Sequence, residues 1–231
     1  MKVQNEFSKY ADQYGNYNII QDKVVQKLVS DLVDQPEHIL DLGCGKGALF
    51  NAVEWPVEHF VGIDFAPGML ELHPKEASHV DVVECIYGDF NDVALFEQLS
   101  YQHFDRIFSA SALQWADNLD LVFKNIASLN RPLSLAIFSG STFKTMFETA
   151  GVTPLLRSSD EVITLAKQHF NVEVEVVQYK LEFESVREMF RYIKRSGVSG
   201  NRNLLGFKEM KKLMKEYPLN YLEFEVVFLK S

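Results

Sequence analysis

The chain has 231 residues, of which 47% are hydrophobic and 24% are charged, and its formal net charge at pH 7 is −9. These values are typical of one large globular α/β domain, and the negative charge disfavours general binding to nucleic acid. Because no apolar run reaches the ~20 residues of a membrane span and the first residues are polar, we expect neither a membrane helix nor a secretion signal.

The two cysteines, Cys44 and Cys85, each lie inside an apolar run, and nothing in the sequence has metal-ligand spacing. Buried thiols suit a reducing compartment. We therefore expect a cytoplasmic protein with no metal site. A monomer is the expected state in solution.

Residues 7–21 carry side chains spaced by threes and fours, which places them on one helical face: Phe7, Tyr10, Tyr14, Tyr17 and Gln21. One interpretation is simple hydrophobic docking onto the main domain. The other is an N-terminal lid, residues 1–21, whose tyrosine hydroxyls reach a ligand carboxylate, with Tyr14 expected to bind the cofactor and Tyr17 the substrate.

Residues 38–48, His-Ile-Leu-Asp-Leu-Gly-Cys-Gly-Lys-Gly-Ala, carry the main functional signal. A short apolar run ends in Gly43, Gly45 and Gly47, and a helical pattern follows at once. The pattern predicts a strand, a tight turn and a helix. Glycines let the backbone approach a ligand closely, and the start of a helix offers unpaired N–H groups. The turn is therefore the expected ligand site; the alternative is a glycine-rich turn without a ligand.

The identity of the ligand depends on Asp41. Gly43, Gly45 and Ala48 also fit the dinucleotide pattern G-x-G-x-x-(G/A). However, a carboxylate just before the first glycine would repel a pyrophosphate and attract the amine of an amino-acid ligand. The run Asp-Leu-Gly-Cys-Gly-Lys-Gly resembles motif I of the class I S-adenosylmethionine-dependent methyltransferases. This resemblance implies S-adenosylmethionine as cofactor and S-adenosylhomocysteine as product, with Asp41, Gly43, Cys44 and Gly45 as cofactor-binding residues.

Asp64 follows the second predicted strand, at about the distance from the glycines expected for an acid that binds ribose hydroxyls. The alternative role of Asp64 is to cap the helix that begins at Ala66-Pro67. Phe65 and Met69 lie beside it in the sequence, and Met69 would cover an edge of the adenine. We expect all three residues to bind the cofactor.

The third predicted strand leads into Asp89 and Phe90. A carboxylate beside an aromatic ring suits adenine, because Asp89 could accept from the exocyclic amine while Phe90 packs on the ring. A helix N-cap is the alternative for Asp89. Ser109, at the end of the fourth predicted strand, is a further expected cofactor residue.

The loop after the fourth strand, Ser111-Ala-Leu-Gln-Trp115, should face the transferring methyl group, since ligands of open α/β sheets bind beyond the carboxyl ends of the strands. Gln114 and Trp115 are therefore expected to bind the substrate. Trp115 could instead serve only as a core anchor.

Strands alternate with helices over the first 140 residues, which predicts a parallel, doubly wound sheet. The full prediction is an α/β, Rossmann-like, seven-stranded sheet, mostly parallel with the last strand antiparallel. One methyltransferase domain, 1–231, would carry the N-terminal lid and a helical insertion, 185–217, over the active site. The predicted strands are 39–42, 60–63, 80–87, 104–109, 133–139, 171–183 and 221–229, and the main helices are 21–33, 119–129, 142–150, 159–169, 185–195 and 207–217.

Charge is unevenly distributed along the chain. Residues 186–217 contain nine basic and three acidic side chains, a net charge of +6, so the rest of the chain carries −15. Solvated helix faces explain most such lysines. A basic patch on an acidic protein could also steer a polyanionic partner.

Four stretches make the chain resemble the biotin-pathway malonyl-acyl-carrier-protein O-methyltransferases. They are 7–21, Ser109-Ala-Ser-Ala-Leu-Gln-Trp115, Ile193-Lys-Arg-Ser-Gly-Val198 and Tyr217-Pro-Leu-Asn-Tyr221. The resemblance implies methyl transfer from S-adenosylmethionine to the free carboxylate of a malonyl thioester on acyl carrier protein. One departure is the run Val198-Ser-Gly-Asn-Arg-Asn, which differs from many members and concerns substrate detail.

A carboxylate nucleophile needs no general base, so we expect catalysis by proximity and no catalytic acid or base. The malonyl carboxylate needs hydroxyls or a cation, for which Tyr14, Tyr17, Lys194 and Arg195 are candidates. Acyl carrier protein is acidic, so the +6 segment would be its docking surface. The alternatives are a small-molecule carboxyl or N-methyltransferase outside biotin synthesis, and a non-catalytic S-adenosylmethionine-binding protein.

Overall fold

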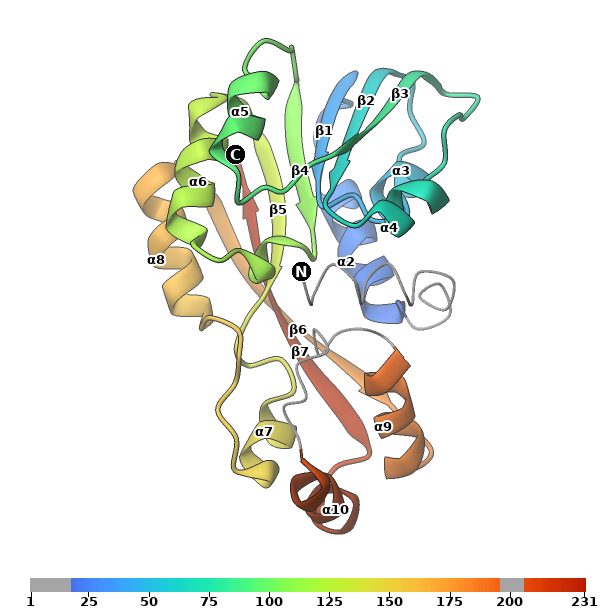
Figure 1. Ribbon diagram of the computed structural model, residues 1–231, viewed down its shortest axis with the longest axis vertical. Coiled ribbons are helices and arrows are strands. Elements are labelled where there is room, and N and C mark those ends of the chain that lie inside the picture. The colour runs from blue at the N-terminus through green and yellow to red at the C-terminus, as the bar shows by residue number, and fades with distance from the viewer. Residues whose placement is uncertain (1–17, 196–205) are drawn as a thin grey trace.

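A computed structural model describes residues 18–195 and 206–231 of the chain. Seven strands form one sheet in the order β3-β2-β1-β4-β5-β7-β6 (Figure 1). The first five strands are parallel, and β7 is antiparallel to both β5 and β6. The predicted fold class is therefore confirmed. The strands are β1 (His38–Leu42), β2 (Val57–Asp64), β3 (Val80–Tyr87), β4 (Arg106–Ala110), β5 (Leu133–Phe138), β6 (Glu173–Glu182) and β7 (Tyr221–Lys230).

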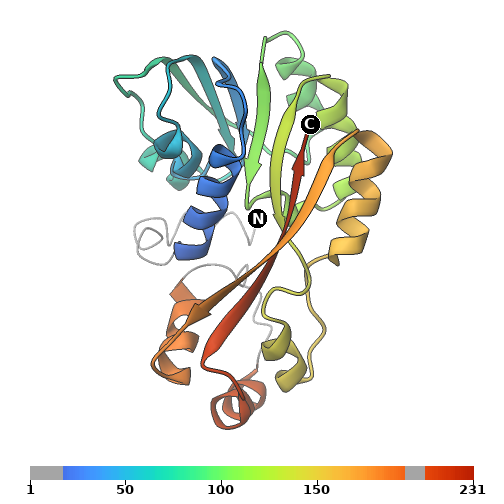
Figure 2. The same ribbon diagram turned by 180° about the vertical axis from the view of Figure 1, so that it is seen from behind.

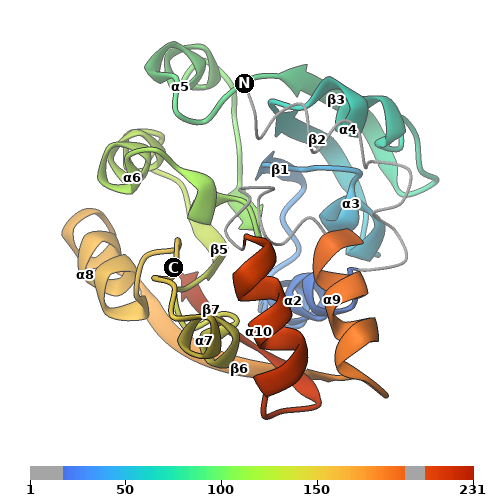
Figure 3. The same ribbon diagram turned by 60° about the horizontal axis from the view of Figure 1, so that its bottom comes forward.

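Helices cover both faces of the parallel part of the sheet. Figures 1 and 3 show α5, α6 and α8 on one side and α2 and α3 on the other. Strands covered on both faces are mostly apolar, as in β5, where every residue is buried and five of six are apolar. The helices are α2 (Ile19–Ser30), α3 (Ala48–Ala52), α4 (Pro67–Leu72), α5 (Val93–Leu99), the 3₁₀ turn η2 (Leu113–Trp115), α6 (Leu119–Ser128), α7 (Lys144–Ala150), α8 (Ser159–His169), α9 (Val186–Arg195) and α10 (Phe207–Glu216).

Element boundaries follow local capping and pairing. The prediction for α8 matches its bounds because Ser158 caps it, accepting from the N–H of Glu161. The second strand was predicted too short, since β3 pairs with β2 from Val57 onward. The fourth strand begins two residues later than predicted because Asp105 turns its carboxylate to the backbone N–H groups at the start of β1.

The strands β6 and β7 continue as a twisted ribbon beyond the rest of the sheet (Figure 2). Their far ends carry α7, α9 and α10, which share a second apolar core with the ribbon. We call this part the lower lobe. The predicted insertion, 185–217, corresponds to α9 and α10. Of the residues that the structure describes, no helix is long and apolar enough to cross a membrane.

Candidate active site

The glycine turn between β1 and α3 is hydrogen-bonded to the end of β2. The backbone N–H groups of Gly43 and Cys44 both donate to the carbonyl oxygen of Ile63, at 2.8 and 2.9 Å. The N–H of Gly45 donates to Asp64 Oδ2 at 2.9 Å. These three amide groups, which precede the start of α3, are therefore already paired with the end of β2. An oxyanion such as a pyrophosphate would find their N–H groups already used, one of them by a carboxylate.

The three glycines of the turn serve two different purposes. All adopt positive φ, but a Cβ on Gly43 would lie 2.2 Å from Ala112 Cβ, and one on Gly47 would lie 2.8 Å from Pro74 Cδ. These two glycines allow loops of the protein itself to meet. A Cβ on Gly45 would meet no atom within 4 Å. Gly45 is therefore the glycine that leaves space for a ligand.

A cavity of about 550 Å³ opens over this turn, at the carboxyl ends of β1, β2 and β4. Its size is within the ~300–1,000 Å³ typical of small-molecule sites. The sheet order also changes direction between β1 and β4, where open α/β sheets bind their ligands. The cavity brings together these predicted site residues: Gly43, Cys44, Gly45, Asp64, Phe65, Met69, Phe90 and Trp115.

Asp64 ties two loops together in the wall of the cavity. Its Oδ1 accepts from the N–H of Ala66 at 2.8 Å, and its Oδ2 accepts from Gly45. Burial raises the pKa of its carboxyl group, although these backbone donors act to lower it. Ala66 is the N-cap residue of α4, and no side chain caps that helix. Asp64 is thus placed at the strand end where an acid can meet a ribose.

Asp41 lies buried beneath the turn, behind the cavity wall. Its Oδ1 has no hydrogen-bond partner among the described residues. Burial, and then the charge of Asp64, raise the pKa of the Asp41 carboxyl to about 8. A buried polar atom without a partner is costly unless a ligand supplies one. An ammonium group is the partner that suits a buried carboxylate.

Cys44 is part of the wall and is chemically inert. Burial raises the pKa of its thiol far above the ordinary value, with further contributions from Asp41 and Asp64. A thiol that stays protonated is a poor nucleophile. Its contribution is packing, because a Cβ on Gly62 would lie 2.9 Å from its Sγ.

Besides Asp41, two predicted cofactor residues, Asp89 and Ser109, lie outside the cavity wall. Asp89 is exposed, and its Oδ1 accepts from the backbone and side-chain amides of Asn91 at 2.9 and 2.8 Å. It does not cap α5, because Asp92 has that role. Ser109 is completely buried and donates its hydroxyl to the carbonyl of Leu42 at 2.7 Å, which joins β4 to β1.

The loop after β4 holds a strained residue that the sequence did not reveal. Ser111 has φ of 63°, which is uncommon for a residue other than glycine, and its buried Oγ has no partner in the described structure. Its carbonyl accepts from Gln114 Nε2 at 2.6 Å. Ser111 and Trp115 line the cavity, whereas Gln114 supports the loop from behind.

The start of α2 supplies further lining residues, which sequence reasoning missed as a group: Asn18, Gln21 and Asp22. The first two each have a buried side-chain oxygen without a partner among the described residues. Asp22 is exposed at the cavity mouth, and desolvation there raises the pKa of its carboxyl. One indication of these lining residues was present in the sequence, because Gln21 lies on the helical face predicted for residues 7–21.

Four predicted residues cannot be placed. Tyr14 and Tyr17 lie outside the described residues. Lys194 and Arg195 end α9, but the description does not extend to their side chains. Among the side chains that the structure describes in α9 and α10, none lines the cavity.

Comparison with known proteins decides the family. A family model described as a methyltransferase domain matches residues 34–173, which include the glycine turn and most of the cavity wall. The chain belongs to this methyltransferase family. The methyltransferase therefore uses S-adenosylmethionine as its cofactor, in agreement with the prediction from Asp41 and the glycines.

Individual relatives are more distant. The methyltransferase is 30% identical over 155 residues to a malonyl-[acyl-carrier protein] O-methyltransferase of Halalkalibacterium halodurans, covering 63% of this chain and 57% of that protein. A protein of the same name from Anoxybacillus flavithermus is 23% identical over 245 residues, with 96% and 90% of the two chains covered. Among solved structures, a SAM-dependent methyltransferase and possible histamine N-methyltransferase of Thermotoga maritima shares the fold, with a TM-score of 0.58, 13% identity and 99% of both chains covered.

Proposed function

We propose that this methyltransferase methylates the free carboxylate of a malonyl group carried by acyl carrier protein, in the biotin (pimeloyl) pathway. The observation that carries the proposal is the likeness to two enzymes named for that reaction, one of them aligned with 96% of this chain. The chain spans 57% of the length of the first of these relatives, so the identity of the acceptor is a proposal, which the assay below tests.

The cofactor would be held by residues that already fit it. Asp41 would offer the amino group a buried carboxyl oxygen that has no partner among the described residues, and Gly45 leaves the space above the turn. Asp64 would accept from the ribose hydroxyls, and Met69 and Phe90, which line the cavity, would pack against adenine. Bound S-adenosylmethionine supplies a methyl group that is already activated by its sulfonium centre.

The chain's own work is then to align the acceptor and exclude water. A malonyl carboxylate is ionised at neutral pH, so no residue has to remove a proton. Catalysis by proximity is the consequence. Trp115 and the strained Ser111 line the side of the cavity expected for the acceptor. Tyr17, Gln114, Lys194 and Arg195 remain the proposed partners of the substrate.

The lower lobe supplies a surface for the carrier protein. Helix α10 buries Leu213 in the core of the lower lobe. Its other side carries four exposed lysines: Lys208, Lys211, Lys212 and Lys215. Acyl carrier protein is acidic, and complementary charge raises the rate of encounter. We propose a monomeric, cytoplasmic enzyme that meets its carrier through α10.

The decisive assay incubates the full chain with methyl-labelled S-adenosylmethionine and malonyl-acyl carrier protein, followed by mass measurement of the carrier. The expected result is a gain of one methyl group, which is lost when the malonyl carboxylate is absent. Label that never enters the carrier would overturn the proposed acceptor.

Charge reversal tests the docking surface. The double substitution Lys211→Glu with Lys212→Glu should raise KM for the carrier severalfold and leave kcat unchanged, because surface charges act mainly on association. The matched control reverses the exposed Lys124 and Lys167 on α6 and α8 and should leave KM unchanged. An equal effect in both variants would contradict docking at α10.

One observation favours a second candidate. The exposed Asp22 carboxyl at the cavity mouth would repel an anionic acceptor and attract an amine. The second candidate is therefore a small-molecule N-methyltransferase. The same labelling assay with amine acceptors separates the two, and Asp22→Asn should impair only a cationic acceptor.

A further inference from the structure

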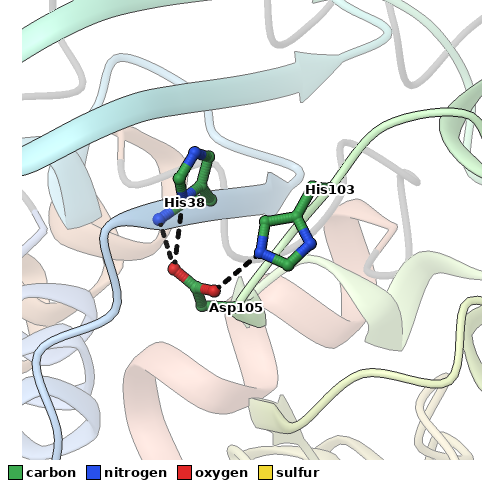
Figure 4. Close-up of side chains that lie close together, drawn as sticks. All are labelled: His38, His103 and Asp105. Carbon is green, nitrogen blue, oxygen red and sulfur yellow. Dashed lines mark hydrogen bonds and ion pairs between the residues drawn. The ribbon is translucent and has the colours of Figure 1, made fainter.

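A cluster of possible metal ligands lies at the amino ends of the parallel strands, away from the cofactor cavity. It consists of His38, the first residue of β1, and of His103 and Asp105, which lie just before β4 (Figure 4). None of the three lines the cavity. Sequence spacing gives no hint of the cluster, because 67 positions separate His38 from Asp105.

Asp105 is held rigidly at the centre of the cluster. Its Oδ2 accepts from the backbone N–H groups of Glu37 and His38, at 3.0 and 2.8 Å. His103 Nε2 lies 3.0 Å from Asp105 Oδ1, and His38 Nδ1 lies 3.3 Å from Oδ2. One atom from each of the three side chains falls within 4.8 Å of the others. Ligand atoms of a tetrahedral zinc site lie roughly 3.3 Å apart, given bonds of about 2.0–2.1 Å.

The second ring nitrogen of His38 also indicates that a cation belongs in this cluster. His38 Nε2 lies 3.5 Å from Glu58 Oε2, so the ring stands between two carboxylates. A neutral imidazole has one N–H and one lone pair, and therefore can satisfy only one of them. A cation between Nδ1 and Asp105 removes the conflict. Carboxylate–histidine–metal arrangements of this kind fix the ring of a metal ligand.

We propose that His38 Nδ1, His103 Nε2 and the Asp105 carboxylate bind one divalent transition-metal ion of the zinc class. Two imidazoles and one carboxylate suit Zn²⁺, Ni²⁺ and Co²⁺, whereas Mg²⁺ and Ca²⁺ prefer oxygen ligands. The His103 side chain is 58% exposed, so an ion can reach the site from solvent. The bound ion would join the start of β1 to the start of β4, which stabilises the folded chain.

The test titrates ZnCl₂ into the full chain, free of any histidine tag and treated with chelator, by calorimetry and thermal melting. One ion per chain should bind, and the melting temperature should rise with its concentration. His103→Ala should weaken Zn²⁺ more than tenfold, and Glu58→Gln about tenfold. The matched control is His169→Ala, which removes a two-residue pair whose Nε2 and Asp120 Oδ1 lie 2.7 Å apart. This control should leave the affinity unchanged.

Two results would overturn the proposal. The first is an absence of saturable Zn²⁺ binding to the chelator-treated chain. The second is binding that His103→Ala and His169→Ala weaken equally. Because His103→Ala alters an exposed side chain, its unfolding temperature without metal should stay near that of the unaltered chain, and Mg²⁺ should produce no shift in either protein.

Discussion

The cofactor end of the sheet and the lower lobe are built in different ways. Strand β1, which leads into the glycine turn, is buried at four of its five positions, and the turn is fixed by backbone hydrogen bonds to β2. Helix α10 of the lower lobe instead exposes most of its residues and carries a row of lysines. The first region therefore tolerates little change in shape, while the second acts through charge. Substitutions in the two regions should have separable effects.

The largest effect is expected at Gly43. Gly43→Ala places a methyl group 2.2 Å from Ala112 Cβ at a φ of +80°, so we expect a loss of about 2–5 kcal/mol of unfolding free energy and no cofactor binding. The control is Gly151→Ala, at a φ of +71° with open space around it, which should lose only about 1–2 kcal/mol. Urea unfolding measures both, and equal losses would contradict a clash at the turn.

The next effect concerns Asp41. Asp41→Asn should weaken S-adenosylmethionine by about tenfold to hundredfold, the factor that corresponds to ~1.5–3 kcal/mol for a hydrogen bond to a charged group. The exposed Asp81 provides the control, since Asp81→Asn should leave the affinity unchanged. Calorimetry measures the affinity, and an unaltered value in Asp41→Asn would place the amine elsewhere.

The same group predicts a pH dependence of stability. The Asp41 pKa is about 8 in the folded protein and ~3.9 in an unfolded chain. Between these values the folded chain keeps a proton that the unfolded chain has lost, so the contribution of Asp41 to stability falls as pH rises from about 4 to about 8. Asp41→Asn should therefore be more stable than the unaltered apo chain at pH 8, and the advantage should shrink toward pH 4.

A smaller effect is expected at Ser111. Ser111→Gly relieves a positive φ and removes a buried hydroxyl for which residues 18–195 and 206–231 offer no partner, so the apo chain should gain about 1 kcal/mol. Thermal unfolding with and without cofactor measures the gain. If the strain at Ser111 positions the acceptor loop, Ser111→Gly should also lower kcat. A loss of stability in this variant would mean that the loop is not strained.

The smallest change in stability belongs to the lower lobe. The double substitution Lys211→Glu with Lys212→Glu should alter the unfolding free energy by less than ~0.5 kcal/mol, because both side chains are exposed. Chemical unfolding checks this value beside the change in KM. A large loss would mean that α10 is structural, and the contrast between the two regions would fail.

Much of the fold could be predicted because it depends on local patterns. The alternation of apolar strands and amphipathic helices predicted each strand in order, and α8 to the residue. The length of β2 could not be predicted, since its first residues are ordered as a strand by pairing with β3 from Val57 onward. The antiparallel last strand was also predicted and is confirmed by its pairing with β5.

The site could be predicted from the sequence only where its residues belong to a recognisable local motif. Asp41 lies in β1, Gly45 in the turn that follows and Asp64 at the end of β2, and the glycine and acid content of these strand ends is visible in the sequence. The contribution of Asn18 at the start of α2 was not, because helical periodicity does not tell which loop lies against a polar end. The strain at Ser111 was also hidden, since no residue type announces it.

The most direct test of the central claim is calorimetric titration of the full chain with S-adenosylhomocysteine, with NADH as comparison. The account predicts one molecule of S-adenosylhomocysteine per chain, no heat with NADH, and a loss of affinity above tenfold in Gly45→Ala but not in Gly151→Ala. Tighter binding of NADH, or equal affinity in the two glycine variants, would contradict a cofactor site over the turn at Gly45.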